Sequence, residues 1–189
     1  IGQSMLIVFT WLALIFISGI NLLIFFGLFS IFISILSYLI FFVEKFNYIK
    51  IRIASFFDSS SNNYSQAEKA SEAIIDGGFF GKGVGEGTLN SKIPEAHTDF
   101  IISVISEEFG IVIILIIMLA FIIFAYNIFK KIRDMNDNTF KMILTGLISL
   151  LLMQAFVHVG VNLRVLPTTG MTLPYLSYGG SSIISISII

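Results

Sequence analysis

A glutamate, a histidine and an aspartate lie within five residues of one another, next to a long apolar segment. They are Glu95, His97 and Asp99, in the sequence PEAHTDF at positions 94–100. A carboxylate held close to its target can act as a general base, and a nearby histidine can share in proton transfer. Helix capping is the structural alternative, because Thr98 and Asp99 are good N-cap residues and an aspartate favours the positive end of a helix. The spacing of these residues, taken alone, favours helix capping over catalysis.

Polar residues recur at helical spacing in two apolar segments, which places each set on one helix face. The first set is Asp99, Ser103, Ser106 and Glu107, and the second is Gln154, His158 and Asn162. Polar groups inside a membrane span usually face the bundle interior or a cavity. We therefore expect the two stripes to meet and to form a polar groove that opens outward, with the first stripe as its acidic wall. Hydrogen bonding between helices is the simpler alternative, and it is the more typical role of a lone histidine such as His158.

Six glycines lie between positions 77 and 87, namely Gly77, Gly78, Gly81, Gly83, Gly85 and Gly87. They do not form a Walker loop, because no Gly-Lys-Ser/Thr follows at the required spacing. No predicted strand precedes them, as a dinucleotide-binding turn would require. Spacing favours a flexible surface loop. The alternative is a backbone that passes close to a bulky group, where only glycine fits.

The composition indicates a membrane protein. Of the 189 residues, 56% are hydrophobic and only 12% are charged, against about 25% charged in soluble domains. The net charge of −1 provides no basic surface for nucleic acid. The sequence has no cysteine, which excludes disulfides and cysteine-ligated metals.

Five apolar segments are candidate membrane spans, at residues 5–20, 22–43, 100–129, 142–166 and 182–189. A spanning helix needs about 20 mostly apolar residues. The sequence therefore predicts an all-α fold, a polytopic bundle of transmembrane helices that forms one membrane domain over residues 1–189. Both ends of the chain lie in apolar sequence, so we expect it to be part of a longer protein.

The connecting segments predict the orientation in the membrane. The short loop 130–141 contains four basic residues, Lys130, Lys131, Arg133 and Lys141, and is therefore predicted to be cytoplasmic. Loops 44–99 and 167–181, which hold all three prolines, are then extracytoplasmic. Within the longer loop, residues 66–76 have the pattern of a short amphipathic helix at the membrane surface, which Gly77 and Gly78 end.

Four motifs in order resemble the FtsW/RodA, or SEDS, family of bacterial membrane proteins. They are PEAHTDF at 94–100, LPTTG at 166–170, TLP at 172–174 and SYGGSS at 177–182. The resemblance covers the whole chain, corresponds to the C-terminal half of the family's members, and is closer to the cell-division branch than to the elongation branch. Two residues depart from the family pattern, since His158 and Arg164 stand where asparagine and glycine are commoner.

The resemblance implies a peptidoglycan glycosyltransferase that polymerises lipid II into glycan strands. Asp99 matches the essential acidic residue of the family, which implies that it is the catalytic base of an inverting glycosyl transfer. The expected substrate contacts are in the motifs, at Glu95, His97, Thr98, Pro167, Thr168, Thr169, Gly170, Ser177, Tyr178, Gly179, Gly180 and Ser181. No residue is predicted to bind a metal. The leaving diphosphate nevertheless needs a cation, which is either a divalent metal or a basic residue such as Lys82, Lys92 or Arg164.

The same resemblance implies a class B penicillin-binding protein and other division proteins as partners, at the septum in the bacterial cytoplasmic membrane. A lipid II flippase and a non-catalytic scaffold that recruits the penicillin-binding protein are the alternatives. A flippase needs polar residues through the full membrane depth, whereas the polar residues here gather in the outer half. A secondary transporter is less compatible, because its broken helices lie at mid-membrane. We expect residues 1–189 by themselves to have no glycosyltransferase activity.

Overall fold

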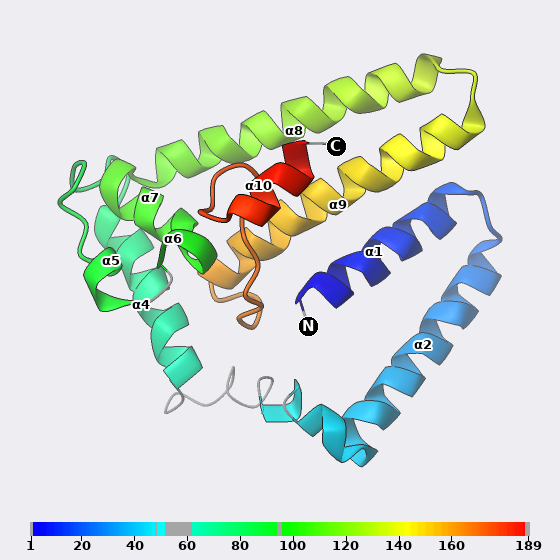
Figure 1. Cartoon of the computed structure of the whole chain (residues 1–189), viewed down its shortest axis with the longest axis horizontal. Coiled ribbons are helices and arrows are strands. Elements are labelled where there is room, and N and C mark those ends of the chain that lie inside the picture. The colour runs from blue at the N-terminus through cyan, green and yellow to red at the C-terminus, as the bar shows by residue number, and fades with distance from the viewer. Residues whose placement is uncertain (1, 48, 52–61, 94–95, 188–189) are drawn as a thin grey trace.

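The computed structural model describes residues 2–47, 49–51, 62–93 and 96–187, and every regular element within them is a helix (Figure 1). This confirms the predicted all-α fold. Three of these helices are long and apolar enough to cross a membrane, namely α2 (Leu22–Phe42), α8 (Ile111–Asp134) and α9 (Asn138–Asn162). A shorter apolar helix, α1 (Gly2–Ile17), precedes them.

Helices α1 and α2 form a hairpin that opens away from its turn (Figure 1). The side chain of Asn21 accepts a hydrogen bond of 3.0 Å from the backbone N–H of Leu23 and so caps α2. Helix α1 packs along α9, whereas no described side chain of α2 is buried. Helix α2 thus presents apolar side chains on all sides, a surface suited to lipid or to further helices.

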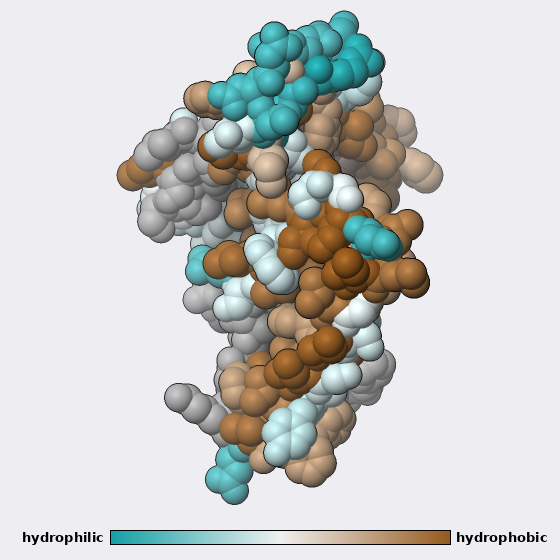
Figure 2. Space-filling model, turned by 90° about the vertical axis from the view of Figure 1, so that its right-hand side faces the viewer, coloured by the Kyte–Doolittle hydropathy of each residue, from teal (hydrophilic) through white to brown (hydrophobic). Residues whose placement is uncertain are grey.

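Helices α8 and α9 form a second antiparallel hairpin and pack against each other (Figure 1). Its turn is shorter than the predicted loop 130–141, because α8 continues to Asp134 and α9 already begins at Asn138. Asp137 sets this start by accepting hydrogen bonds from the N–H groups of Thr139 and Phe140. Figure 2 shows hydrophilic residues gathered over this end of the molecule, above a largely hydrophobic surface.

Four shorter helices gather at the end of α8 and α9 that lies away from their turn (Figure 1). They are α4 (Asn62–Gly77), α5 (Leu89–Lys92), α6 (Ala96–Asp99) and α7 (Ile101–Phe109), and together we name them the helical cap. Helix α4 confirms the predicted amphipathic helix. However, its apolar side packs against protein, mostly α7, and buries Ala67, Ala70, Ala73 and Ile74.

The predicted span 100–129 is not one helix. Gly110 ends α7 with a φ of +83° and starts α8, so the spanning helix begins at Ile111 and α7 belongs to the helical cap. Only glycine adopts this backbone conformation without strain. A Cβ at Gly110 would also collide with the backbone of Phe79.

Helix α9 ends four residues before the predicted boundary at position 166. Arg164 there has a left-handed φ of 58°, and the N–H groups of Val165 and Leu166 both bond to the carbonyl of Gly160. This is the usual geometry of a helix C-terminus, in which a glycine normally holds the left-handed position. Residues 167–179 then lead to α10 (Gly180–Ser187).

Candidate functional site

Asp99 is the last residue of α6, and Phe100, not Thr98 or Asp99, occupies the N-cap position of α7. The interpretation of Thr98 or Asp99 as the N-cap of α7 is therefore wrong. The side chain of Asp99 is half-buried at the junction of the two helices. Its neighbour Phe100 is buried and anchors the junction in the core.

The two polar stripes meet beneath Asp99 in part, through Ser103 of the first stripe and through His158 and Asn162 of the second. The Asn162 Oδ1 atom accepts a hydrogen bond of 2.7 Å from the Ser103 hydroxyl, and its Nδ2 donates one of 3.2 Å to the Asp99 carbonyl. The His158 Nε2 atom lies 3.4 Å from the Thr98 carbonyl. Ser103, His158 and Asn162 are all fully buried. These contacts hold the backbone of residues 98 and 99 in place, which is the structural role expected for a lone histidine.

The segment 167–180 closes over the same backbone from the other side. The Ser177 hydroxyl donates a hydrogen bond of 2.7 Å to the Thr98 carbonyl, and the N–H of Tyr178 donates one of 3.1 Å to the carbonyl of His97. Gly170 has a φ of +67°, and a Cβ placed on it would lie 3.6 Å from the Asp99 Oδ2 atom. The motifs at 96–100, 166–170 and 177–180 therefore converge on Asp99.

The predicted substrate contacts differ in exposure. His97, Gly170, Tyr178 and Gly180 are exposed, Thr98, Pro167, Thr168, Thr169 and Gly179 are half-buried, and Ser177 is buried. Ser177 thus acts on the backbone and does not face solvent. Glu95 and the side chain of Ser181 lie outside the described residues.

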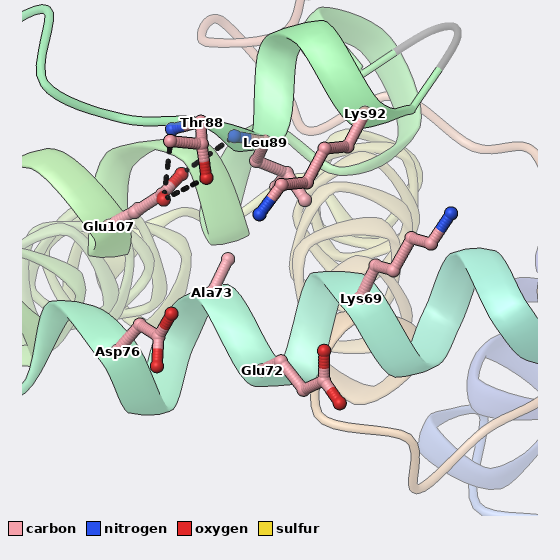
Figure 3. A pocket seen from close by; sticks show the side chains of 8 residues that line it. All are labelled: Lys69, Glu72, Ala73, Asp76, Thr88, Leu89, Lys92 and Glu107. Carbon is pink, nitrogen blue, oxygen red and sulfur yellow. Dashed lines mark hydrogen bonds between the residues drawn. The ribbon is translucent and has the colours of Figure 1, made fainter.

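Glu107 does not contribute to an acidic wall beside Asp99, as the stripe had suggested. Its carboxylate is 2% exposed. It turns toward the end of the segment that contains the six glycines, residues 77–87, which we name the glycine-rich loop (Figure 3). The Oε1 atom accepts hydrogen bonds from the Thr88 N–H (2.9 Å) and hydroxyl (3.1 Å), and Oε2 accepts one from the Leu89 N–H (3.0 Å). Burial alone would raise the pKa of Glu107, but these bonds, with a contribution from Lys82, lower it below its usual value.

The glycine-rich loop fits closely against α7, so the interpretation of a flexible surface loop is wrong. The N–H groups of Lys82 and Gly83 donate to the carbonyls of Glu107 (2.9 Å) and Glu108 (3.1 Å). A Cβ on Gly77 or Gly81 would collide with the backbone of α7. The alternative interpretation, a backbone that passes close to another group, holds at these positions.

Two of the three candidate cations form ion pairs on the helical cap. Lys82 lies 3.2 Å from Asp76 and 3.4 Å from Glu107, and the pairing with Asp76 contributes most to raising the pKa of Lys82. Arg164 lies 3.9 Å from Glu68.

The third cation, Lys92, lines a small pocket between α4, α5 and α7, together with Lys69 and Glu72 (Figure 3). Among the described residues, no group of three or more histidine, aspartate or glutamate side chains could hold a metal ion.

The model of the FtsW/RodA/SpoVE family of cell cycle proteins matches residues 1–189. The chain belongs to this family. Its apolar helices and this membership identify it as a membrane protein.

Curated relatives in the family are named probable peptidoglycan glycosyltransferase FtsW. The protein of Caulobacter vibrioides is 38% identical over 145 residues, which cover 76% of this chain and 37% of the relative. The protein of Dichelobacter nodosus is 34% identical over 194 residues, covering 99% of this chain and 48% of the relative. The chain thus spans less than half the length of these two relatives.

A solved structure of a peptidoglycan synthase complex, described as coordinating polymerization and crosslinking, contains a chain of the same fold. It superposes with a TM-score of 0.78 over 98% of this chain and 52% of that one, at 24% sequence identity. At this identity the likeness establishes the fold of the FtsW/RodA/SpoVE chain and nothing further.

Proposed function

We propose that the protein to which these residues belong is a peptidoglycan glycosyltransferase that polymerises lipid II during septal cell-wall synthesis. The observation that carries the proposal is that two motif segments close around the half-buried Asp99. Gly170 lies beside its carboxylate, and Ser177 and Tyr178 donate hydrogen bonds to the carbonyls of Thr98 and His97. The names of the curated relatives support the same activity. The description of the matching family as cell cycle proteins supports a role in division.

In the proposed reaction Asp99 is the general base. It accepts the proton of the acceptor sugar's hydroxyl while that oxygen attacks the anomeric carbon of the donor. The bond to the lipid diphosphate breaks on the opposite face, so the configuration at the anomeric carbon inverts. Asn162, His158 and Ser177 fix the backbone around Asp99, and this keeps the carboxylate in the geometry that proton transfer requires.

The exposed residues around Asp99 are the proposed substrate contacts. Gly170 lacks a side chain beside the carboxylate, which leaves space for a sugar to approach. His97 and Tyr178 are exposed on the two segments that join there, so their side chains can reach a bound headgroup.

The leaving diphosphate requires positive charge. All three basic residues remain candidates, because Lys82 and Arg164 lie beside carboxylates and Lys92 lines a pocket that also contains Glu72. A divalent cation would take its further ligands from the diphosphate and from the rest of the protein, since the described residues supply no acidic cluster.

The proposed partner is a class B penicillin-binding protein in the bacterial cytoplasmic membrane. The complex that contains the matching fold coordinates polymerization with crosslinking, which supports a crosslinking partner here. The polymerase and the crosslinking enzyme would then act on the same nascent strand.

Lipid II polymerisation by the purified full-length protein and its partner tests the proposal. The comparison is Asp99→Asn against Asp134→Asn, which removes the same charge from an exposed position at the far end of α8. Glycan product should be lost only with Asp99→Asn, at equal folding and partner binding. Unchanged product in both variants would refute the catalytic role and favour a scaffold or a flippase. Supplying lipid II in detergent removes any need for transport.

A further inference from the structure

Two phenylalanines project from the glycine-rich loop without cover from the described residues. Phe79 is 73% exposed and Phe80 is 87% exposed, and we name this pair the aromatic tip. Ile75 and Val84, on either side of the tip in the sequence, are 77% and 74% exposed. An apolar patch of this kind usually marks a surface that contacts a membrane or another molecule.

The aromatic tip is held in a fixed position. The N–H of Gly81 donates to the carbonyl of Gly77 across the tip (2.8 Å), and the N–H of Lys82, just after the tip, donates to the carbonyl of Glu107 (2.9 Å). The tight fit of Gly81 against the backbone of Glu108 prevents the loop from folding inward. The loop therefore holds the two rings away from the helical cap.

The tip lies at the level where the spanning helix begins. The N–H of Ile111, the first residue of α8, donates a hydrogen bond of 2.9 Å to the carbonyl of Gly78. Val112 and Leu115 in the first turns of α8 are exposed apolar residues, so the tip extends the lipid-facing surface of a membrane span. The end of a span marks the boundary between hydrocarbon and headgroups.

Charged residues of the loop and of the last turn of α4 are exposed alongside the tip and give it a polar border. They are Asp76, Lys82 and Glu86, and the first two pair with each other. An apolar edge with a charged border is the arrangement of segments that lie in the membrane interface.

We propose that the aromatic tip inserts into the leaflet on the side of the helical cap and packs against lipid acyl chains. Because the same loop is bonded to α7, the inserted rings set the height of the helical cap above the bilayer. This inference concerns membrane contact and is independent of the glycosyltransferase activity.

Spin-label accessibility in the full-length protein tests the insertion. A nitroxide is attached to Phe80→Cys, after replacement of any native cysteines, and the protein is reconstituted into phosphatidylethanolamine and phosphatidylglycerol vesicles. The matched control is Glu86→Cys, an exposed position on the same loop. Collisions with oxygen, which dissolves in hydrocarbon, are compared with collisions with a water-soluble nickel chelate.

The label at position 80 should favour oxygen over nickel, and the label at position 86 should show the reverse. Equal nickel accessibility at the two positions would overturn the proposal, because the tip would then lie in water. An immobilised label at position 80 that neither reagent reaches would overturn it too, since protein would then cover the tip. A label at Phe79→Cys repeats the measurement if the first variant fails to fold.

Discussion

Glu107→Gln should loosen the glycine-rich loop from α7. The carboxylate gives Thr88 and Leu89 two separate acceptor oxygens, and a glutamine offers only one. With the glutamine oxygen toward Thr88, its NH₂ group faces the buried N–H of Leu89, donor against donor. A buried donor without an acceptor costs about 1–3 kcal/mol, so we expect the loop to lose about 2 kcal/mol of local stability.

Hydrogen exchange of the full-length protein measures this loss directly. A change of 2 kcal/mol should speed exchange at Thr88 and Leu89 by roughly 30-fold, because every 1.4 kcal/mol is a factor of ten. The folded-state pKa of Glu107 is lowered, so its contribution is present at neutral pH and is lost as the pH falls through that pKa. The difference between wild type and Glu107→Gln should therefore shrink only below the ordinary glutamate value of about 4.3.

Glu108→Gln is the matched control, because it makes the same chemical change one residue away. The half-buried Glu108 accepts one hydrogen bond of 3.3 Å, from the N–H of Gly85, which a glutamine oxygen can also accept. We expect a change below about 0.5 kcal/mol. Equal exchange rates in the two variants at neutral pH would refute the role assigned to Glu107.

Four further substitutions test other parts of the site. Gly81→Ala should cost ~3 kcal/mol through its left-handed φ and its collision with α7, whereas Gly85→Ala, with open space around it, should cost only ~1 kcal/mol in thermal unfolding. Arg164→Gly should stabilise the protein by about 0.5 kcal/mol, because relief of the left-handed strain exceeds the loss of the partly exposed pair with Glu68. Asn162→Leu should cost about 2–4 kcal/mol and abolish polymerisation, because its buried hydrogen-bonding partners lose their bonds.

Helical periodicity made the core of the site predictable. The i, i+4 spacing of His158 and Asn162 fixes them on one face of α9, and the spacing of Ser103 fixes it on the face of α7 that they meet. Side chains of this kind inside an apolar bundle must find partners, so their meeting follows from the sequence.

The break at Gly110 could not be predicted from local sequence. A single glycine inside an apolar helix is tolerated at a cost of about 1 kcal/mol, so it does not by itself signal an end. What decides the break is the backbone of Phe79, which lies against Gly110 from a loop 31 positions earlier in the sequence. The direction in which the Glu107 side chain points depends on the same loop. The path of that loop cannot be predicted from a local sequence pattern.

The predicted end of α9 was wrong for a different reason. Apolar residues alternate with Asn162 and Arg164 up to Leu166, so the hydropathy pattern does not mark the residue at which the helix stops. The stop depends on Arg164, which takes a left-handed conformation in a position where glycine is normal.

The pH dependence of lipid II polymerisation, with and without Asp99, tests the central claim most directly. If Asp99 is the general base, the activity of the full-length protein and its partner should fall on the acid side with a single ionisation. The small residual activity of Asp99→Asn should lack this acid limb. An Asp99→Asn variant that polymerises lipid II at the wild-type rate, with the same acid limb, would contradict the account.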